Sequence, residues 1–252
     1  MSKVFRACAR PLRYLARAMD ETLLPRGCQS CGNSLGEDDK ELCPLCRRAL
    51  QAAIGQGTYC PRCGVSIGAF TEPTGGCNRC RNFKLAYDRL ARVGLYQGPL
   101  AELIRALKFR RRAHSARFLG QLLFQAIQGA DLAKDFELIT WVPLHWWRRW
   151  NRGYNQAELL ARRLASLSGQ PARPLLKRIR WTAPQTRLTR SARLANVRGA
   201  FALRRGISIT GKRVLLVDDV LTTGATASEA SSVLLTAGAQ VSVAVLAVAT
   251  TF

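Results

Sequence analysis

The pattern of apolar and polar positions switches between two periods after about residue 90. Four largely apolar runs have the length of strands in a buried sheet, at 91–97, 138–144, 212–219 and 239–251. Apolar residues recur at helical spacing between these runs, at 99–109, from about 113 to 126, at 154–169 and at 225–238. Strands that alternate with helices predict an α/β fold, with a parallel sheet, right-handed crossovers and helices on both faces.

The segment 177–200 departs from this pattern. It is rich in Arg and poor in apolar periodicity, although it lies in the middle of the predicted domain. We therefore predict a long exposed segment there, of the kind that is usually functional or disordered.

The first 19 residues combine Arg with short apolar stretches. Arg interrupts each stretch, so the segment lacks the apolar core of a secretory signal. No run in the chain approaches the ~20 apolar residues that span a bilayer. We predict a basic helix within residues 1–25 that packs on the rest of the chain, no membrane span, and a cytoplasmic location.

The charge balance is strongly basic. The 252 residues include 39 Lys and Arg against 16 Asp and Glu, which gives a formal net charge of +23. Such a surface attracts phosphate-rich partners, and a pI above ~9 is typical of nucleic-acid-binding domains. The charge therefore favours contact with a nucleic acid.

Eight of the nine cysteines form four CxxC pairs, at Cys28 and Cys31, Cys43 and Cys46, Cys60 and Cys63, and Cys77 and Cys80. A CxxC turn holds two thiolates at two corners of a zinc tetrahedron. Disulfides are the competing interpretation, but spaced cysteines without a secretion signal favour metal. Four pairs within 53 residues are also too many for a redox motif.

The spacing predicts a double zinc-ribbon module at 26–84 with two structural sites. The first would use Cys28, Cys31, Cys43 and Cys46, and the second Cys60, Cys63, Cys77 and Cys80. A cross-braced pairing, first with third and second with fourth, fits the same spacing. Four cysteines leave no open coordination position, so such sites stabilise the fold and do not catalyse.

The most informative stretch is VLLVDDVLTTGAT, at 214–226. An apolar strand delivers Asp218 and Asp219 to its carboxyl end, which is where ligands bind in parallel α/β sheets. The turn through Gly224 leads into a helix, whose first amides and dipole favour an anion. Carboxylates suit ribose hydroxyls, and the hydroxyls of Thr222, Thr223 and Thr226 can donate to phosphate oxygens.

This stretch resembles the signature of type I phosphoribosyltransferases over all thirteen positions. The resemblance implies that Asp218 and Asp219 contact the 2′- and 3′-hydroxyls of a ribose. It implies that the turn holds the 5′-phosphate with Leu221, Thr222, Thr223, Gly224, Ala225 and Thr226. The implied ligand is phosphoribosyl pyrophosphate with Mg²⁺, bound by a transferase-like domain at 85–252.

Three further segments are similar to the ComF family, namely LKFRR (107–111), VPLHWWRRWNRGYNQAELLA (142–161) and TAPQTRLTRSARLANVRGAF (182–201). The family also places a cysteine module before the transferase domain. The resemblance implies that Arg148, Arg149 and Arg152 lie near the diphosphate, although a solvated charge run fits these residues too. It implies a mobile loop that carries Gln185, Arg193 and Asn196.

Two hypotheses about function follow. The first is an enzyme or former enzyme of the phosphoribosyltransferase class that binds phosphoribosyl pyrophosphate, with an acceptor that the sequence does not specify. The second is a single-stranded DNA-binding or scaffold protein, in which the transferase fold serves as a sensor platform. The ComF resemblance implies a link to natural transformation, with DNA-uptake or recombination proteins as partners. We expect Trp146, Trp147 and Trp150 to cover the edge of the core rather than stack on bases.

Overall fold

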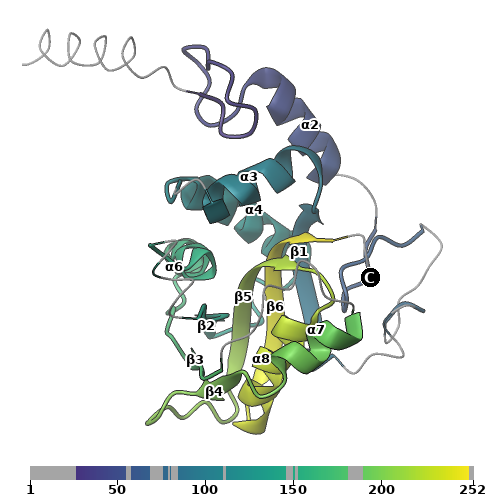
Figure 1. Ribbon diagram of the computed structural model, residues 1–252, viewed down its shortest axis with the longest axis vertical. Coiled ribbons are helices and arrows are strands. Elements are labelled where there is room, and N and C mark those ends of the chain that lie inside the picture. The colour runs from purple at the N-terminus through teal and green to yellow at the C-terminus, as the bar shows by residue number, and fades with distance from the viewer. Residues whose placement is uncertain are drawn as a thin grey trace, which may run out of the picture.

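A four-stranded parallel sheet forms the centre of the molecule (Figure 1). The computed structural model describes residues 27–54, 58–68, 76–78, 80, 85–109, 112–145, 150, 153–180 and 190–249. The strand order is β1 (Arg89–Leu95), β6 (Gln240–Val248), β5 (Arg213–Leu221) and β2 (Leu138–Trp141). The predicted α/β fold with a parallel sheet is therefore confirmed.

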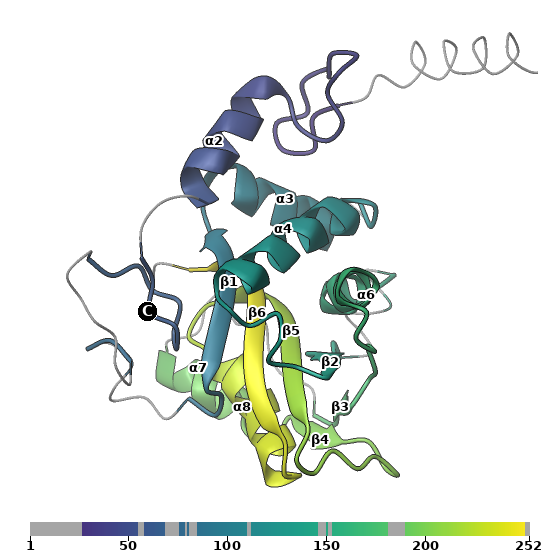
Figure 2. The ribbon, with the colours of Figure 1, turned by 180° about the vertical axis from the view of Figure 1, so that it is seen from behind.

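Helices cover both faces of the sheet, as the sequence predicts. One face carries α3 (Gly98–Phe109), α4 (Ser115–Gly129) and α6 (Gln156–Ser168), and the other carries α8 (Ala225–Thr236) (Figure 2). Alternate side chains of β5 pack on the two helix layers. Leu215 and Val217 pack with the first group of helices, and Val214 and Leu216 pack with α8. This two-sided burial explains why the central strands are nearly continuously apolar.

The segment predicted to be exposed and irregular contains secondary structure. Helix α7 (Arg190–Val197) packs on α8, and the short strands β3 (Leu176–Arg178) and β4 (Phe201–Leu203) pair antiparallel on either side of it. Arg180 Nη2 donates to the carbonyls of Asn196 (3.0 Å) and Arg198 (2.5 Å), which satisfies the carboxyl end of α7. The Gly199 amide donates to Glu229 Oε1 on α8 at 2.6 Å. Tertiary contacts, not local apolar periodicity, hold the described residues of this segment.

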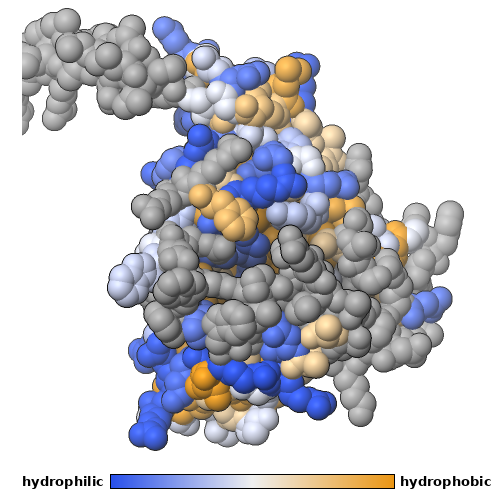
Figure 3. Space-filling model, in the orientation of Figure 1, coloured by the Kyte–Doolittle hydropathy of each residue, from blue (hydrophilic) through white to orange (hydrophobic). Residues whose placement is uncertain are grey.

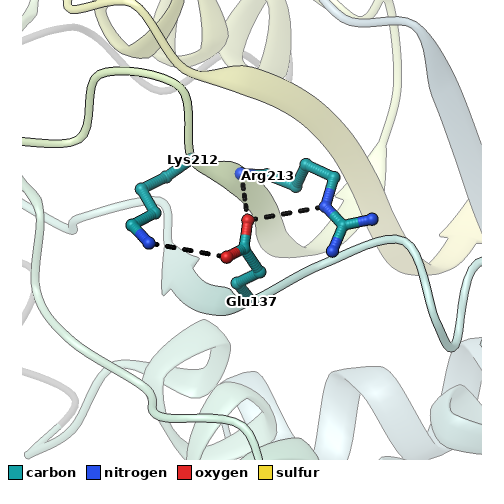
Figure 4. A network of polar contacts seen from close by, with 3 residues as sticks. All are labelled: Glu137, Lys212 and Arg213. Carbon is teal, nitrogen blue, oxygen red and sulfur yellow. Dashed lines mark hydrogen bonds and ion pairs between the residues drawn. The ribbon is translucent and has the colours of Figure 1, made fainter.

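At the amino ends of β2 and β5, Glu137 lies between two cations (Figure 4). Its carboxylate accepts from Lys212 Nζ at 3.5 Å and from Arg213 Nε at 3.4 Å. The backbone amide of Arg213 donates to the same carboxylate at 3.3 Å and, together with the charge of Lys212, lowers the pKa of Glu137. These exposed contacts contribute little to stability, but they mark the end of the sheet opposite the two carboxylates of β5.

The two cysteine segments occupy different parts of the molecule (Figure 1). The first continues into α2 (Pro44–Ile54), a helix that the sequence analysis did not predict and that packs on α3 and β1. The second lies beside β1, where the Leu90 amide donates to the Pro61 carbonyl at 2.6 Å. The predicted helix within 1–25 lies outside the described residues. Among the helices that are described, none combines the length and the apolar character needed to cross a bilayer.

Candidate functional site

Two carboxylates stand near the carboxyl end of β5, and they have different environments. Asp219 is 5% exposed, and its Oδ1 lies 2.8 Å from Lys108 Nζ at the end of α3. Its Oδ2 accepts from Gln156 Nε2, at the start of α6, at 2.5 Å. Asp219 is thus a buried carboxylate with one cationic and one amide partner, and it joins three separate segments of the chain.

The residues that lead into α6 fix this arrangement. Asn155 is the N-cap of α6, since its side chain accepts from the Ala157 amide at 3.0 Å. Its Nδ2 donates to the carbonyl of Val142, just after β2, at 3.0 Å. Tyr154 donates from its hydroxyl to the Leu107 carbonyl at 2.5 Å. The start of α6 is therefore fastened to both β2 and α3, which places Gln156 against Asp219.

Asp218 is partly exposed, and its surroundings stabilise its negative charge less well than those of Asp219 do. Burial, and then the charge of Asp219, raise the pKa of Asp218 to about 7. The backbone amide of Asp219, which donates to Asp218 Oδ1 at 2.8 Å, and the charges of Lys108 and Arg178 oppose this rise. Ionisation of Asp218 therefore costs free energy in the folded chain, and a cation or hydroxyl donor at this position would recover it.

The turn after β5 has the form of an anion-binding turn. Gly224 has φ +76°, a left-handed conformation, and precedes the first residue of α8. The Thr223 hydroxyl accepts from the Ala225 amide at 3.4 Å. The end of β5 and this turn connect the two carboxylates to the amino end of α8, which brings hydroxyls, amides and the positive end of the helix dipole to one edge of the sheet.

The remaining expected ligand residues are placed only in part. Arg148, Arg149, Arg152 and Gln185 lie outside the described residues, as does the side chain of Arg193. Asn196 lies on α7, which packs on α8. Trp150 is 78% exposed, so the expectation that it covers the core edge is wrong.

Sequence reasoning missed Lys108 and Gln156. Both belong to segments quoted for the family resemblance, and both are polar residues on the buried face of an amphipathic helix. Lys108 follows the buried Ile104 by one turn, and Gln156 precedes the buried Leu160 by one turn. A polar side chain at a buried helical position was the signal that could have found them.

The first cysteine site gathers Cys28, Cys31, Cys43 and Cys46, whose sulfur atoms all lie within 4.8 Å of one another. The Sγ atoms of Cys31 and Cys43 are 3.8 Å apart. Cys31 is exposed, whereas Cys28 and Cys43 are buried beside α2. The Gly32 amide donates to the Cys28 carbonyl at 2.9 Å, and Gly32 has φ +83°, which closes the knuckle.

The second site repeats this knuckle and is fully buried. It gathers Cys60, Cys63, Cys77 and Cys80, with the Gly64 amide donating to the Cys60 carbonyl at 2.8 Å. Sulfur pairs lie 3.6 Å apart for Cys60 and Cys80 and for Cys63 and Cys77. The two groups follow the chain order, which excludes the cross-braced pairing.

Both clusters fit a zinc ion. A tetrahedron with Zn–S bonds of ~2.3 Å has sulfur–sulfur edges of ~3.8 Å, close to the sulfur–sulfur distances of 3.6–3.9 Å in the two clusters. Burial raises the pKa of Cys60, but amides of Cys63, Arg62 and Cys77 offset this and lower it to about 7. Burial raises the pKa of Cys80 to about 11, with the neighbouring Cys60 adding to the rise. A divalent cation is therefore needed to hold all four as thiolates.

Comparison with known proteins agrees with both parts of the chain. Residues 19–81 match the double zinc ribbon domain, and residues 152–250 match the phosphoribosyl transferase domain. The two cysteine clusters are thus four-cysteine zinc-binding sites of a structural kind.

Relatives match over most of the chain. The DNA utilization protein YhgH of Salmonella typhi is 34% identical over 86% of this chain and 93% of its own length. Competence protein F of Haemophilus influenzae is 32% identical over 82% of this chain and 90% of its own length. Competence protein ComFC of Streptococcus pneumoniae is 29% identical over 82% and 86%. The chain therefore belongs to the ComF family, with a double zinc ribbon domain ahead of a phosphoribosyl transferase domain.

Proposed function

We propose that the chain binds phosphoribosyl pyrophosphate with Mg²⁺ at the carboxyl edge of the sheet, between Asp218 and the turn that ends at Gly224. The observation that carries the proposal is that the ionised Asp218 carboxylate is poorly stabilised by its surroundings and lies on the strand that leads into a left-handed glycine turn and the amino end of α8. The match of residues 152–250 to the phosphoribosyl transferase domain supports this ligand class.

The two carboxylates would have different roles. Asp218 is partly exposed and would accept from ribose hydroxyls. Asp219 already accepts from Lys108 and Gln156, so it would position the strand end and Asp218. The Thr222–Thr226 turn would hold the 5′-phosphate through hydroxyl and amide donors.

The diphosphate needs cationic partners. Mg²⁺ with the ligand would neutralise diphosphate oxygens and so favour their departure. From the family resemblance, Arg148, Arg149 and Arg152 would add positive charge, and the segment with Gln185, Arg193 and Asn196 would close over the ligand. Exclusion of water in this way would favour transfer of the ribosyl group to an acceptor over hydrolysis.

The biological setting proposed is DNA uptake or DNA use. The relatives named for competence and DNA utilization support it. We propose a cytoplasmic location, because eight thiols remain zinc ligands most readily in a reducing compartment. The predicted division into modules 26–84 and 85–252 remains part of this proposal.

Calorimetric titration of zinc-loaded protein with phosphoribosyl pyrophosphate and Mg²⁺ tests the ligand. Asp218→Asn should reduce the affinity by at least about tenfold, because it removes a charged acceptor. Glu137→Gln is the matched control, since it neutralises a carboxylate at the opposite end of β5 and should leave the affinity unchanged. Absence of binding by the unaltered protein, or equal loss in both variants, would refute the proposal.

Single-stranded DNA binding is the second candidate function. It is favoured by the net charge of +23 and by Trp150, which is 78% exposed within an Arg-rich segment. Figure 3 shows hydrophilic residues over much of the described surface in that view, with smaller apolar patches between them. Affinity for an oligonucleotide should fall steeply with salt and should drop on Trp150→Ala, while Asp218→Asn should leave it nearly intact. An affinity that is independent of salt would contradict this function.

A further inference from the structure

We propose that the second cysteine site, and not the first, positions the phosphate-binding turn, through the side chains of Leu85 and Tyr87. For its consequence on ligand affinity the inference rests on the proposed function. The structural link between the second cysteine site and the turn rests on contacts among the described residues alone.

Leu85 packs against both the second cysteine site and the turn at Gly224. It packs against the cluster formed by Cys60, Cys63, Cys77 and Cys80. On its other side, a Cβ added to Gly224 would lie 3.4 Å from Leu85 Cδ2. One apolar side chain therefore separates the metal site from the glycine at which the turn enters α8.

Tyr87, two residues after Leu85, also packs against the turn. It is 2% exposed, and the position of a Gly224 Cβ lies 3.7 Å from its hydroxyl oxygen. Tyr87 belongs to the buried cluster on the α8 side of the sheet, and Leu85 packs against that cluster as well. Within the described part of the chain the buried hydroxyl makes no hydrogen bond, so packing alone holds the ring there.

Backbone contacts fasten the same segment to α8 and β6. The Ala86 amide donates to the Ser228 hydroxyl, in the first turn of α8, at 3.0 Å. The Asp88 amide donates to the Val241 carbonyl at 3.0 Å. Residues 85–88 thus run from the second cysteine site across the start of α8 and into the sheet.

The second site is itself fixed to the edge of β1. A Cβ on Gly64 would lie 2.4 Å from Leu90 Cδ2, which shows how closely the knuckle packs on the strand. The buried Arg92 donates to the Ser66 hydroxyl at 2.9 Å and stacks over the Tyr59 ring at 4.8 Å. These contacts anchor the described part of the second ribbon beside β1, and a bound zinc ion would hold its four cysteines together.

The first cysteine site provides an internal control. Cys28 and Cys43 pack with Leu42 and Leu50 in the core cluster on the α3 and α4 side of the sheet. The cluster on the α8 side contains Tyr87 and none of the first site's described residues. Loss of metal from the first site should therefore leave the turn in place.

Hydrogen exchange of the full-length protein tests the mechanical link without any ligand. Cys77→Ser with Cys80→Ser removes the second metal, and Cys43→Ser with Cys46→Ser removes the first. We expect faster amide exchange across 218–230 in the second-site variant, and exchange like that of the unaltered protein in the first-site variant. Unchanged exchange in both variants, or an equal rise in both, would overturn the inference.

A packing variant keeps the test valid if a cysteine variant misfolds. Leu85→Ala retains all eight ligands, so the protein should still bind two zinc ions while exchange across 218–230 rises. Leu42→Ala, a buried leucine beside the first site, is its control and should leave that segment unchanged. A rise with Leu42→Ala equal to that with Leu85→Ala would refute a specific link.

Calorimetry then separates this inference from the proposed function. The second-site variant and Leu85→Ala should bind phosphoribosyl pyrophosphate about 5- to 150-fold more weakly, and by reciprocity the ligand should raise the zinc affinity of the second site in the unaltered protein. If the unaltered protein binds no ligand, the proposed function fails, while the exchange result still decides the inference. If it binds, and the second-site variants bind equally well, the inference fails and the proposed function stands.

Discussion

Replacement of Lys108 by Met is the sharpest test of how the carboxylates of β5 are held. Lys108 Nζ lies 2.8 Å from Asp219 Oδ1, and the two side chains are 18% and 7% exposed. Met keeps an unbranched stem of similar length and removes the charge. Asp219 would then remain buried beside Asp218 with Gln156 as its described side-chain partner.

The cost can be estimated from this geometry. At 2.8 Å and an effective dielectric constant of ~20, the attraction between unit charges is about 6 kcal/mol before desolvation is counted. Removal of one partner from a buried pair typically costs about 3–5 kcal/mol, because the other charge is left without compensation. This is a large part of a total stability of about 5–15 kcal/mol.

Urea unfolding of the zinc-loaded protein at pH 8, followed by tryptophan fluorescence, measures this cost. Arg105→Met on the same helix is the control, because Arg105 and Glu102 form an exposed pair whose loss should cost less than about 1 kcal/mol. The double variant Lys108→Met with Asp219→Asn should recover much of the loss, since the buried charge of Asp219 is then removed together with its partner. The reasoning is refuted if Lys108→Met costs no more than Arg105→Met, or if the double variant is less stable than Lys108→Met.

Three other predictions concern the turn and the metal sites. Because the pKa of Asp218 is raised to about 7, the affinity for phosphoribosyl pyrophosphate should fall about tenfold from pH 8 to pH 6, once the titration of the ligand itself is corrected for. Isothermal calorimetry should show that Asp218→Asn removes this pH dependence. Gly224→Ala should cost about 1–2 kcal/mol in thermal unfolding and weaken the ligand, because φ is +76° and Leu85 lies against the new Cβ; an unchanged melting temperature would contradict it. Elemental analysis should give two zinc ions per chain, and one for Cys77→Ser with Cys80→Ser; two in that variant would contradict the assignment of ligands.

The central sheet could be predicted from sequence because its strands are buried on both faces. The run that became β6 has eight buried or partly buried residues after Gln240, a pattern that local composition carries by itself. The zinc ligands could be predicted for a similar reason, since each CxxC pair is local in sequence, and the first pair of each site is a turn closed by Gly32 or Gly64. Their grouping required the fold, because the spacing alone allowed two pairings.

The partners of Asp219 could not be predicted, because they come from distant segments. Lys108 and Gln156 reach Asp219 only after α3 and α6 have packed on the sheet, and Asn155 and Tyr154 set that packing by bonds to Val142 and Leu107. Helix α7 escaped prediction for a related reason, since Arg180 donates to a carbonyl at its carboxyl end and Glu229 accepts from the Gly199 amide just beyond it. Local patterns report burial, whereas these residues depend on tertiary contacts.

Asp218 and Asp219 have different environments, and this difference argues for a binding role of Asp218. A raised folded pKa means that the protonated form of Asp218 stabilises the fold below its unfolded pKa of ~3.9, and this stability is lost as pH rises through about 7. At pH 8 the ionised form of Asp218 therefore lowers the free energy of unfolding. The adjacent Asp219 shows that this fold can place a lysine and an amide beside a carboxylate. Asp218→Asn should accordingly raise the free energy of unfolding at pH 8 while it removes ligand affinity. A purely structural carboxylate would show the opposite effect on stability, so the sign of this one change separates a binding residue from a scaffold residue.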